Sequence, residues 1–227
     1  MDLRSALLVD IVRSRDLPDR ANAQTLVRES FAKAEEIVTP VRPLWATAGD
    51  EFQAVCATPG DAVAVTTLVR VLLPEGIDCR FGIGEGEIHD IDAAADARPI
   101  QDGSAWWNAR AAIDRVHGMQ QHGNPDLRTW FVGQGGGVPT VNAFLVARDH
   151  ILTRMKPRER RLAAAYFRGR AQDEIARDEK ISQSAVSQAL GRSGARAVRL
   201  GVDLLRVGGL GHDGDMPPVS ASPSDDA

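Results

Sequence analysis

Ala6-Leu7-Leu8-Val9-Asp10-Ile11-Val12 is an apolar run interrupted by a single carboxylate, and it decides how the rest of the sequence is interpreted. The run is too short to span a bilayer, so we expect a buried first strand. A carboxylate without a partner is costly inside such a strand. Asp10 is therefore the first candidate functional residue.

Helical and strand-like patterns alternate after this run. The expected helices cover 21–38, 61–73 and 104–119, and the expected further strands cover 41–48, 52–57, 79–88 and 128–132. The order β-α-β-β-α-β, with an added helix and strand, is that of a ferredoxin-like sheet with helices on one face. The predicted fold class is α+β.

The chain is expected to divide into four parts. Residues 1–137 form the α+β domain, 138–155 a connecting helix, and 156–207 a second, all-α domain. Residues 208–227 are rich in Gly, Pro, Ser and Asp, a composition that predicts a disordered tail.

Charge is distributed unevenly between these parts. Through Asp149 there are 14 Lys and Arg against 21 Asp and Glu, whereas residues 154–206 contain 13 against 6. The basic segment indicates a polyanionic partner for the second domain. A solvated helical surface would have the same composition, and charge alone does not separate the two interpretations.

The composition also excludes several classes of protein. Cys56 and Cys79 are the only cysteines, and each lies in an apolar segment, which argues against a zinc site and a disulfide framework. The first residues carry Asp2 and Arg4 and lack a small-residue cleavage site. We therefore expect a cytoplasmic protein with no membrane partner.

Further carboxylates lie at the predicted hairpin. Asp50 and Glu51 fall between the strands expected at 41–48 and 52–57, and in a sheet of this order the hairpin tip can lie beside the end of the first strand. Paired carboxylates at adjacent strand ends suit Mg²⁺ and the phosphates of a nucleotide. The alternative is a pair of solvated turn acids.

Four sequence blocks follow one another in the first domain: DIVRSR (10–15), GDEFQ (49–53), RFGIGEGEI (80–88) and DGSAWWNAR (102–110). In this order they resemble the SatD family and, more distantly, class III nucleotide cyclases and GGDEF-type diguanylate cyclases. The resemblance implies a ferredoxin-like nucleotide-cyclase-type domain in which Asp10 and Asp50 hold the metal. The nucleotide-binding residues that follow are Ile11, Val12, Arg13, Ser14, Arg15, Gly49, Glu51, Asn108 and Arg110.

The sequence departs from the cyclases at catalytic positions. Ala46 stands where a class III adenylyl cyclase has a base-selecting lysine, and Asn108 and Arg110 are two residues apart rather than four. No catalytic residue is assigned, and we expect a sensor of ATP, GTP or a cyclic nucleotide. The alternative is a divergent nucleotidyl cyclase that uses two metal ions.

Glycines and tryptophans of the first domain each have two interpretations. Gly82, Gly84 and Gly86 leave room inside a strand for close approach by a ligand or by another backbone. Trp106 and Trp107 either stack on a base or belong to the core or a dimer interface. We favour the core or an interface for at least one of them.

In the second domain, the stretches DEIA (173–176) and ISQSAVS (181–187) form a helix-turn-helix pattern that resembles sigma-factor region four and LuxR-type regulators. Short helices are expected over 172–178 and 183–190, with Ser182 as the N-cap of the second. The alternative is a helical hairpin used for dimerisation. The residues expected to contact DNA are Lys180, Ser182, Gln183, Ser184, Ser187, Gln188 and Arg192.

Together these features predict a transcriptional regulator that binds double-stranded DNA as a homodimer and whose first domain senses a nucleotide, with Mg²⁺ as a possible cofactor. A purely structural interaction domain is the third hypothesis. It requires both Asp10 and Asp50 to be incidental.

Overall fold

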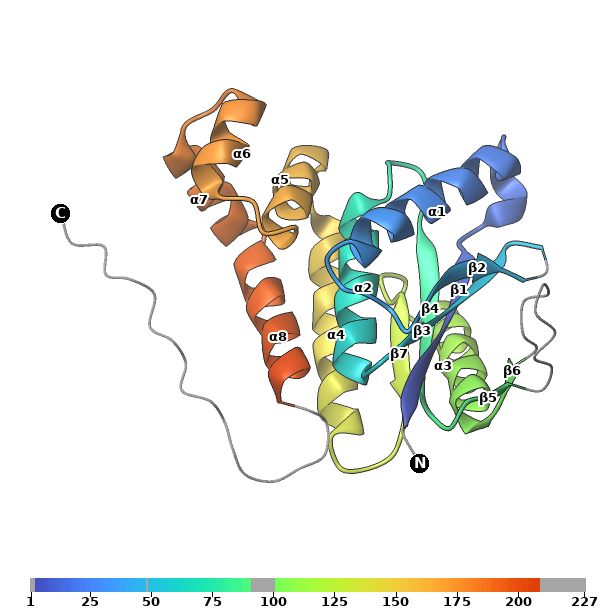
Figure 1. The fold of residues 1–227 in the computed structure, drawn as a ribbon. Coiled ribbons are helices and arrows are strands. Elements are labelled where there is room, and N and C mark those ends of the chain that lie inside the picture. The colour runs from blue at the N-terminus through green and yellow to red at the C-terminus, as the bar shows by residue number, and fades with distance from the viewer. Residues whose placement is uncertain (1–2, 48, 91–100, 209–227) are drawn as a thin grey trace.

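The structure is a computed structural model that describes residues 3–47, 49–90 and 101–208 (Figure 1). The tail expected at 208–227 therefore lies outside the described residues, apart from Gly208. The predicted α+β fold class is confirmed, because a five-stranded sheet is combined with helices between and after its strands.

The main sheet has the strand order β2-β3-β1-β4-β7. Its neighbouring strands are antiparallel except for the parallel pair β4–β7, and β5 and β6 form a separate antiparallel pair. The strands are β1 (Arg4–Ile11), β2 (Arg42–Ala46), β3 (Glu51–Cys56), β4 (Cys79–Gly86), β5 (His89–Asp90), β6 (Gln101–Asp102) and β7 (Thr129–Val132).

Local sequence signals explain where several helices begin. The side chains of Asp19 and Thr58 accept hydrogen bonds from backbone amides in the first turns of α1 and α2, and prolines occupy the first turns of α2, α4 and α5. The helices are α1 (Arg20–Glu35), α2 (Pro59–Leu72), α3 (Ser104–Gln121), α4 (Val138–Arg154), α5 (Pro157–Phe167), α6 (Gln172–Glu179), α7 (Gln183–Arg192) and α8 (Ala195–Val207), with a 3₁₀ turn η1 at Ser14–Asp16.

Both faces of the sheet are covered, which corrects the expectation of helices on one face. In β1, Leu7 and Val9 belong to the cluster that includes residues of α1 and α2, whereas Ala6 and Leu8 belong to a smaller cluster with residues of α3. Figure 1 shows α2 and α3 on opposite sides of the sheet. The physical reason is the parallel pair β4–β7. Parallel neighbours require a crossover connection, and α3 provides it on the opposite face.

The glycines of β4 allow α3 to pack directly on the strand. A Cβ atom on Gly84 would lie 2.1 Å from both the carbonyl oxygen of Ala105 and the amide nitrogen of Ala109, and one on Gly82 would lie 2.2 Å from the Ala109 carbonyl oxygen. Of the two interpretations of these glycines, the structure therefore supports close approach by another backbone.

The tryptophans of α3 lie in different environments. Trp106 is buried and makes an edge-to-face contact with Trp45, with ring centroids 5.9 Å apart, whereas Trp107 is 67% exposed. The expectation that at least one of them belongs to the core is confirmed.

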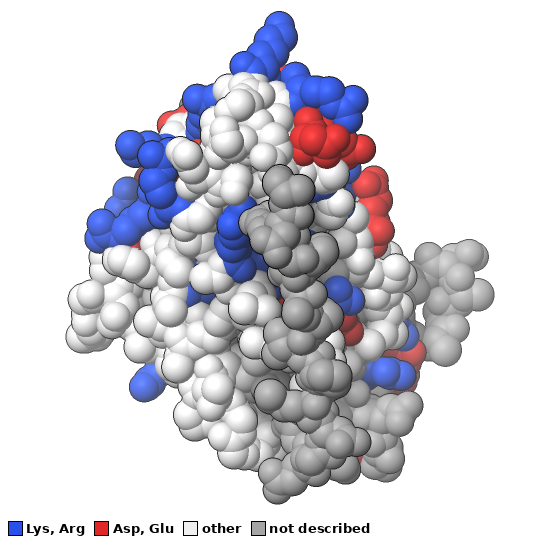
Figure 2. Space-filling model, turned by 90° about the vertical axis from the view of Figure 1, so that its left-hand side faces the viewer, with Lys and Arg blue, Asp and Glu red and all other residues white. Residues whose placement is uncertain are grey.

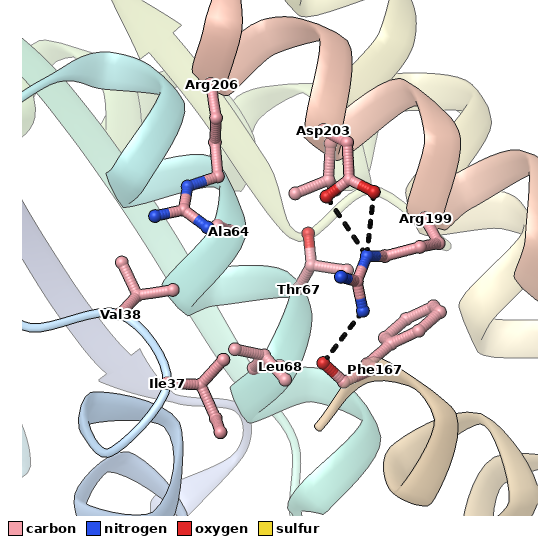
Figure 3. A pocket seen from close by; sticks show the side chains of 10 residues that line it. Ile37, Val38, Ala64, Thr67, Leu68, Phe167, Arg199, Asp203 and Arg206 are labelled. Atoms are coloured by element: carbon pink, nitrogen blue, oxygen red, sulfur yellow. Dashed lines mark hydrogen bonds and ion pairs between the residues drawn. The ribbon is translucent and has the colours of Figure 1, made fainter. Parts of the chain in front are cut away.

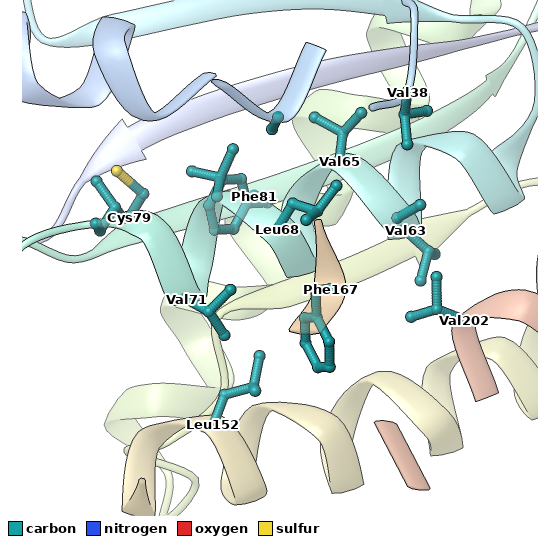
Figure 4. Packing of buried hydrophobic residues seen from close by; sticks show 14 of the residues in the cluster. Val38, Val63, Val65, Leu68, Val71, Cys79, Phe81, Leu152, Phe167 and Val202 are labelled. Atoms are coloured by element: carbon teal, nitrogen blue, oxygen red, sulfur yellow. The ribbon is translucent and has the colours of Figure 1, made fainter. Parts of the chain in front are cut away.

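The apolar core continues across the expected domain boundaries. The boundaries at 137/138 and 155/156 fall close to the starts of α4 and α5, but one buried cluster joins Phe81 of β4 and Val63 of α2 to Leu152, Phe167 and Val202 (Figure 4). The helix expected as a connector is thus part of the core.

Cys56 and Cys79 are buried and free, and burial raises the pKa of the Cys56 thiol to about 12.

Helix α8 packs on α2 and closes a small apolar crevice. The carbonyl oxygen of Leu205 would be only 2.5 Å from a Cβ atom on Gly60, and Arg206 forms an ion pair with Asp61 at 3.1 Å. On the other side of the crevice, Arg199 donates hydrogen bonds to Asp203 and to the Phe167 carbonyl (Figure 3).

Within the described ranges, no helix is long and apolar enough to cross a membrane.

Candidate nucleic-acid interface and nucleotide site

The turn between α6 and α7 has the local geometry that the sequence predicts. Lys180 ends α6 in a left-handed conformation, with φ of 54°. Two residues later the Ser182 hydroxyl accepts a hydrogen bond from the Ala185 amide at 3.1 Å and so caps α7. These two features set the direction in which α7 leaves the turn.

Helix α7 is buried on one side and exposed on the other. Val186 and Leu190 are completely buried and pack in the cluster that also contains Ile175 and Ala176 of α6. Ser187 is half-buried and accepts a hydrogen bond from Arg196 at 2.7 Å, so it is less available than its neighbours. The expected DNA-contacting residues that are exposed are Lys180, Ser182, Gln183, Ser184, Gln188 and Arg192.

Cations from α5 lie next to this polar face. Lys156 and Arg158, at the start of α5, line one shallow groove together with Gln188 and Arg192 of α7. Figure 2 shows Lys and Arg gathered mainly in its upper half, with some Asp and Glu among them. Lys156 and Arg158 were not among the residues expected to contact DNA, because their closeness to α7 depends on the packing of α5. The signal available in the sequence was the basic segment itself.

The arginines around α6 are neutralised by carboxylates. Arg161 pairs with Glu179 at 3.1 Å, Arg170 with Asp178 at 2.5 Å, and Arg177 with Asp173 at 3.6 Å. One acid, Glu159, lines the groove between α5 and α7 against three cations. The groove therefore keeps an excess of positive charge for a polyanion, whereas the arginines on the outer side of α6 are each paired with an acid.

The carboxylates of Asp10 in β1 and Glu51 in β3 each form an ion pair with an arginine. Asp10 pairs with Arg80 at 2.8 Å, and His117 of α3 lies 3.2 Å from the same carboxylate oxygen. Glu51 is the cross-strand neighbour of Asp10, and Arg110 of α3 bonds both of its carboxylate oxygens. The structure thus brings Asp10, Glu51 and Arg110 to one side of the sheet.

Other residues expected to bind a nucleotide have different roles. Ile11 and Ser14 are buried, the Asn108 amide donates to the Glu85 carbonyl at 2.8 Å, and the Gly49 carbonyl accepts from Gln24 at 2.9 Å. The amide of Val12 donates to the Asp78 carbonyl.

Three of the expected residues keep exposed or partly exposed side chains. Arg13 and Arg15 are exposed after β1, and Asp50 is partly exposed at the β2–β3 hairpin. Arg13 adopts a left-handed conformation, with φ of 53°, which is uncommon for a residue other than glycine.

A resident Mg²⁺ fits these residues poorly. In the part of the chain that the structure describes, no group of three or more His, Cys, Asp and Glu is placed to hold a metal ion. Arg80 and His117 also occupy the surroundings of the Asp10 carboxylate that a cation would need.

A buried ionic cluster lies away from both candidate sites and was not predicted. Asp149 and Arg148 of α4 are completely buried, and Asp149 pairs with Arg148 at 2.7 Å and with Arg70 of α2 at 2.8 Å. The second Asp149 oxygen accepts from the amides of Arg128 and Thr129, each at 2.7 Å. This cluster joins α2, α4 and β7; the available signal was the charged pair between Leu145 and Leu152.

These features define a mixed α+β protein whose C-terminal helices are built onto the core of its sheet domain. The model of the SatD family matches residues 5–200, so the chain belongs to the SatD family. The match extends from β1 into α8 and so includes both the sheet and the helices that follow it. No curated protein is significantly similar to the chain.

Proposed function

We propose that this protein is a DNA-binding transcriptional regulator in which α6 and α7 form a helix-turn-helix and α7 enters the major groove. The observation that carries the proposal is the exposed polar face of α7 beside the cations of α5. Side chains near the start of a recognition helix contact base edges, and cations beside it bind phosphates. A dimer with two such helices would bind two half-sites.

The strand order supports a ferredoxin-like, cyclase-type origin for the first part. The order β2-β3-β1-β4, with α1 between β1 and β2 and α2 between β3 and β4, is the β-α-β-β-α-β arrangement expected from the sequence. In this proposal α3 and β7 are additions to that arrangement.

Replacing Gln188 with alanine is expected to weaken binding to a preferred duplex by roughly 10- to 100-fold, because a bidentate contact to a base is worth about 1–3 kcal/mol. Arg192→Ala should weaken binding to all duplexes and lower the salt slope by about one. The measurement is fluorescence anisotropy with labelled duplexes enriched from a random pool.

Arg177→Ala is the matched control for these variants. It removes the same charge from an exposed helical position, but Arg177 pairs with Asp173 and does not line the α5–α7 groove. Equal affinities for the Gln188, Arg192 and Arg177 variants would refute the assignment of α7.

Nucleotide sensing at the end of β1 is the second part of the proposal. It is supported by the left-handed Arg13 and by the exposure of Arg13 and Arg15, neither of which has a carboxylate partner among the described residues. Non-glycine residues in this conformation cluster at ligand sites, and arginine is suited to phosphate. The cation-bound Asp10 argues for a sensor over a cyclase.

The double variant Arg13→Ala/Arg15→Ala is expected to lose roughly tenfold or more of the affinity for ATP or GTP, because two charge-assisted contacts to phosphate are removed. Calorimetry with and without Mg²⁺ measures this loss, and Lys33→Ala, at an exposed position of α1, is the control. Formation of a cyclic product by the wild type would instead make the protein an enzyme, and absence of binding would remove the sensing proposal.

A further inference from the structure

A groove of about 530 Å³ separates the end of α2 and the loop after it from α5. We refer to it as the α2–α5 groove. Its size falls within the range of small-molecule sites. Its floor is apolar, with Leu73 and Pro74 on one side and Ala164 and Ala165 on the other. Such a floor accommodates a ligand with an apolar body.

The rim of the α2–α5 groove is strongly positive. Arg160, Arg161, Arg168 and Arg170 all line it, whereas the lining includes one acid, the exposed Glu75. Arg161 and Arg170 are paired with carboxylates of α6, and Arg168 has a longer contact of 3.7 Å with Glu36. The charge around the groove therefore favours an anionic ligand.

Arg160 is the least compensated of the four. Its guanidinium donates to the Arg70 carbonyl, and within residues 3–47, 49–90 and 101–208 no carboxylate forms an ion pair with it. Burial, and then the nearby charge of Arg70, lower the pKa of Arg160, and the charges of Asp78 and Glu75 oppose this shift only in part. A partly buried cation whose charge is incompletely compensated is costly, so an anion bound beside it would be stabilised.

From these observations we propose that the α2–α5 groove binds a small organic anion, with its apolar body on Ala164 and Ala165 and its negative group at Arg160 and Arg168. This site is distinct from the end of β1 and from the polar face of α7. It lies between the sheet-bearing part and α5, and its detection does not depend on DNA binding.

The test uses 8-anilinonaphthalene-1-sulfonate, an aromatic sulfonate whose fluorescence rises in apolar sites, with the full chain. Saturable binding of one probe per chain is expected. Arg160→Met keeps the apolar stem but removes the charge, and Ala165→Leu fills the floor; each should weaken binding by roughly tenfold or more. Arg177→Met is the control and should bind like the wild type.

Circular dichroism of each variant checks that it is folded. If Arg160→Met does not fold, the affinity of Ala165→Leu for the probe tests the proposal. Inorganic phosphate should displace the probe poorly, because it lacks an apolar body. The proposal is overturned if the wild type shows no saturable binding of the probe or if all variants bind the probe with equal affinity. It is also overturned if inorganic phosphate displaces the probe with an affinity equal to that of the probe.

Discussion

Replacing Asp149 with asparagine is expected to lower the free energy of unfolding by about 3–5 kcal/mol, because it removes one member of a buried ionic cluster. Asp149 is completely buried and contacts the guanidinium groups of Arg70 and Arg148. Asparagine has nearly the same shape but no charge. Arg148 would stay buried without a negative partner, and Arg70 would keep only its longer contact with Asp78, at 3.9 Å. The amides of Arg128 and Thr129 donate to the same Asp149 oxygen, so both would lose a charged acceptor.

Urea denaturation of the full chain measures the loss. Asp126→Asn is the matched control, because it removes the same charge from a carboxylate that contacts the exposed His150. We expect the control to lose less than about 1 kcal/mol. Similar losses for the two variants would show that the buried cluster does not stabilise the fold as described.

The loss of stability caused by Asp149→Asn is expected to depend on pH. Burial by itself would raise the pKa of Asp149, but the opposing charges of Arg148 and Arg70 outweigh it, so the pKa lies below its ordinary value of 3.8. A lowered pKa in the folded state means that the stabilisation is complete above about pH 4 and is lost as the pH falls through the folded-state pKa. The difference in stability between wild type and Asp149→Asn should therefore be constant from neutral pH to about pH 4 and shrink below it.

Replacing Gly84 with alanine is expected to be the most damaging of the glycine substitutions in β4, with a loss of about 3 kcal/mol or more. The new Cβ atom would lie 2.1 Å from two backbone atoms of α3, which cannot move away as a flexible side chain can. Relief requires α3 to shift away from β4, and that shift would also loosen the cluster formed by Ala105, Ala109 and Ile113.

Gly118→Ala, also on α3, is the control for this prediction. A Cβ atom there has no neighbour within 4 Å. Alanine should raise stability by about 0.5–1 kcal/mol, because it favours the helix. Thermal unfolding of both variants measures the contrast, and a tolerated Gly84→Ala would contradict the close packing of α3 on β4.

Much of the secondary structure could be predicted from the sequence because local signals carry it. The apolar run around Val9 becomes β1, and Ser182 caps α7 where the pattern places it. The side of the sheet covered by α3 could not be predicted, because it depends on a parallel pairing of β4 with β7. Long-range pairing leaves no periodicity in the sequence of either partner.

Residues of the candidate sites likewise divide into those that local sequence signals predict and those that depend on contacts between distant segments. The exposed face of α7 follows from helical periodicity, so the exposure of Gln188 and Arg192 could be predicted. The partners of Asp10 could not be predicted, because Arg80 comes from another strand and His117 from helix α3. Predicting the buried Arg148–Asp149 pair would have required knowing that one face of α4, expected as a connecting helix, packs in the core.

The most direct test of the central claim is enrichment of duplexes from a random-sequence pool on the full-length wild-type protein, followed by affinity measurements at fixed salt. We predict an enriched sequence with two half-sites, bound roughly 10³-fold or more tighter than unrelated duplexes. Absence of enrichment, or equal affinity for enriched and unrelated duplexes, would contradict the assignment of this protein as a sequence-specific DNA-binding regulator.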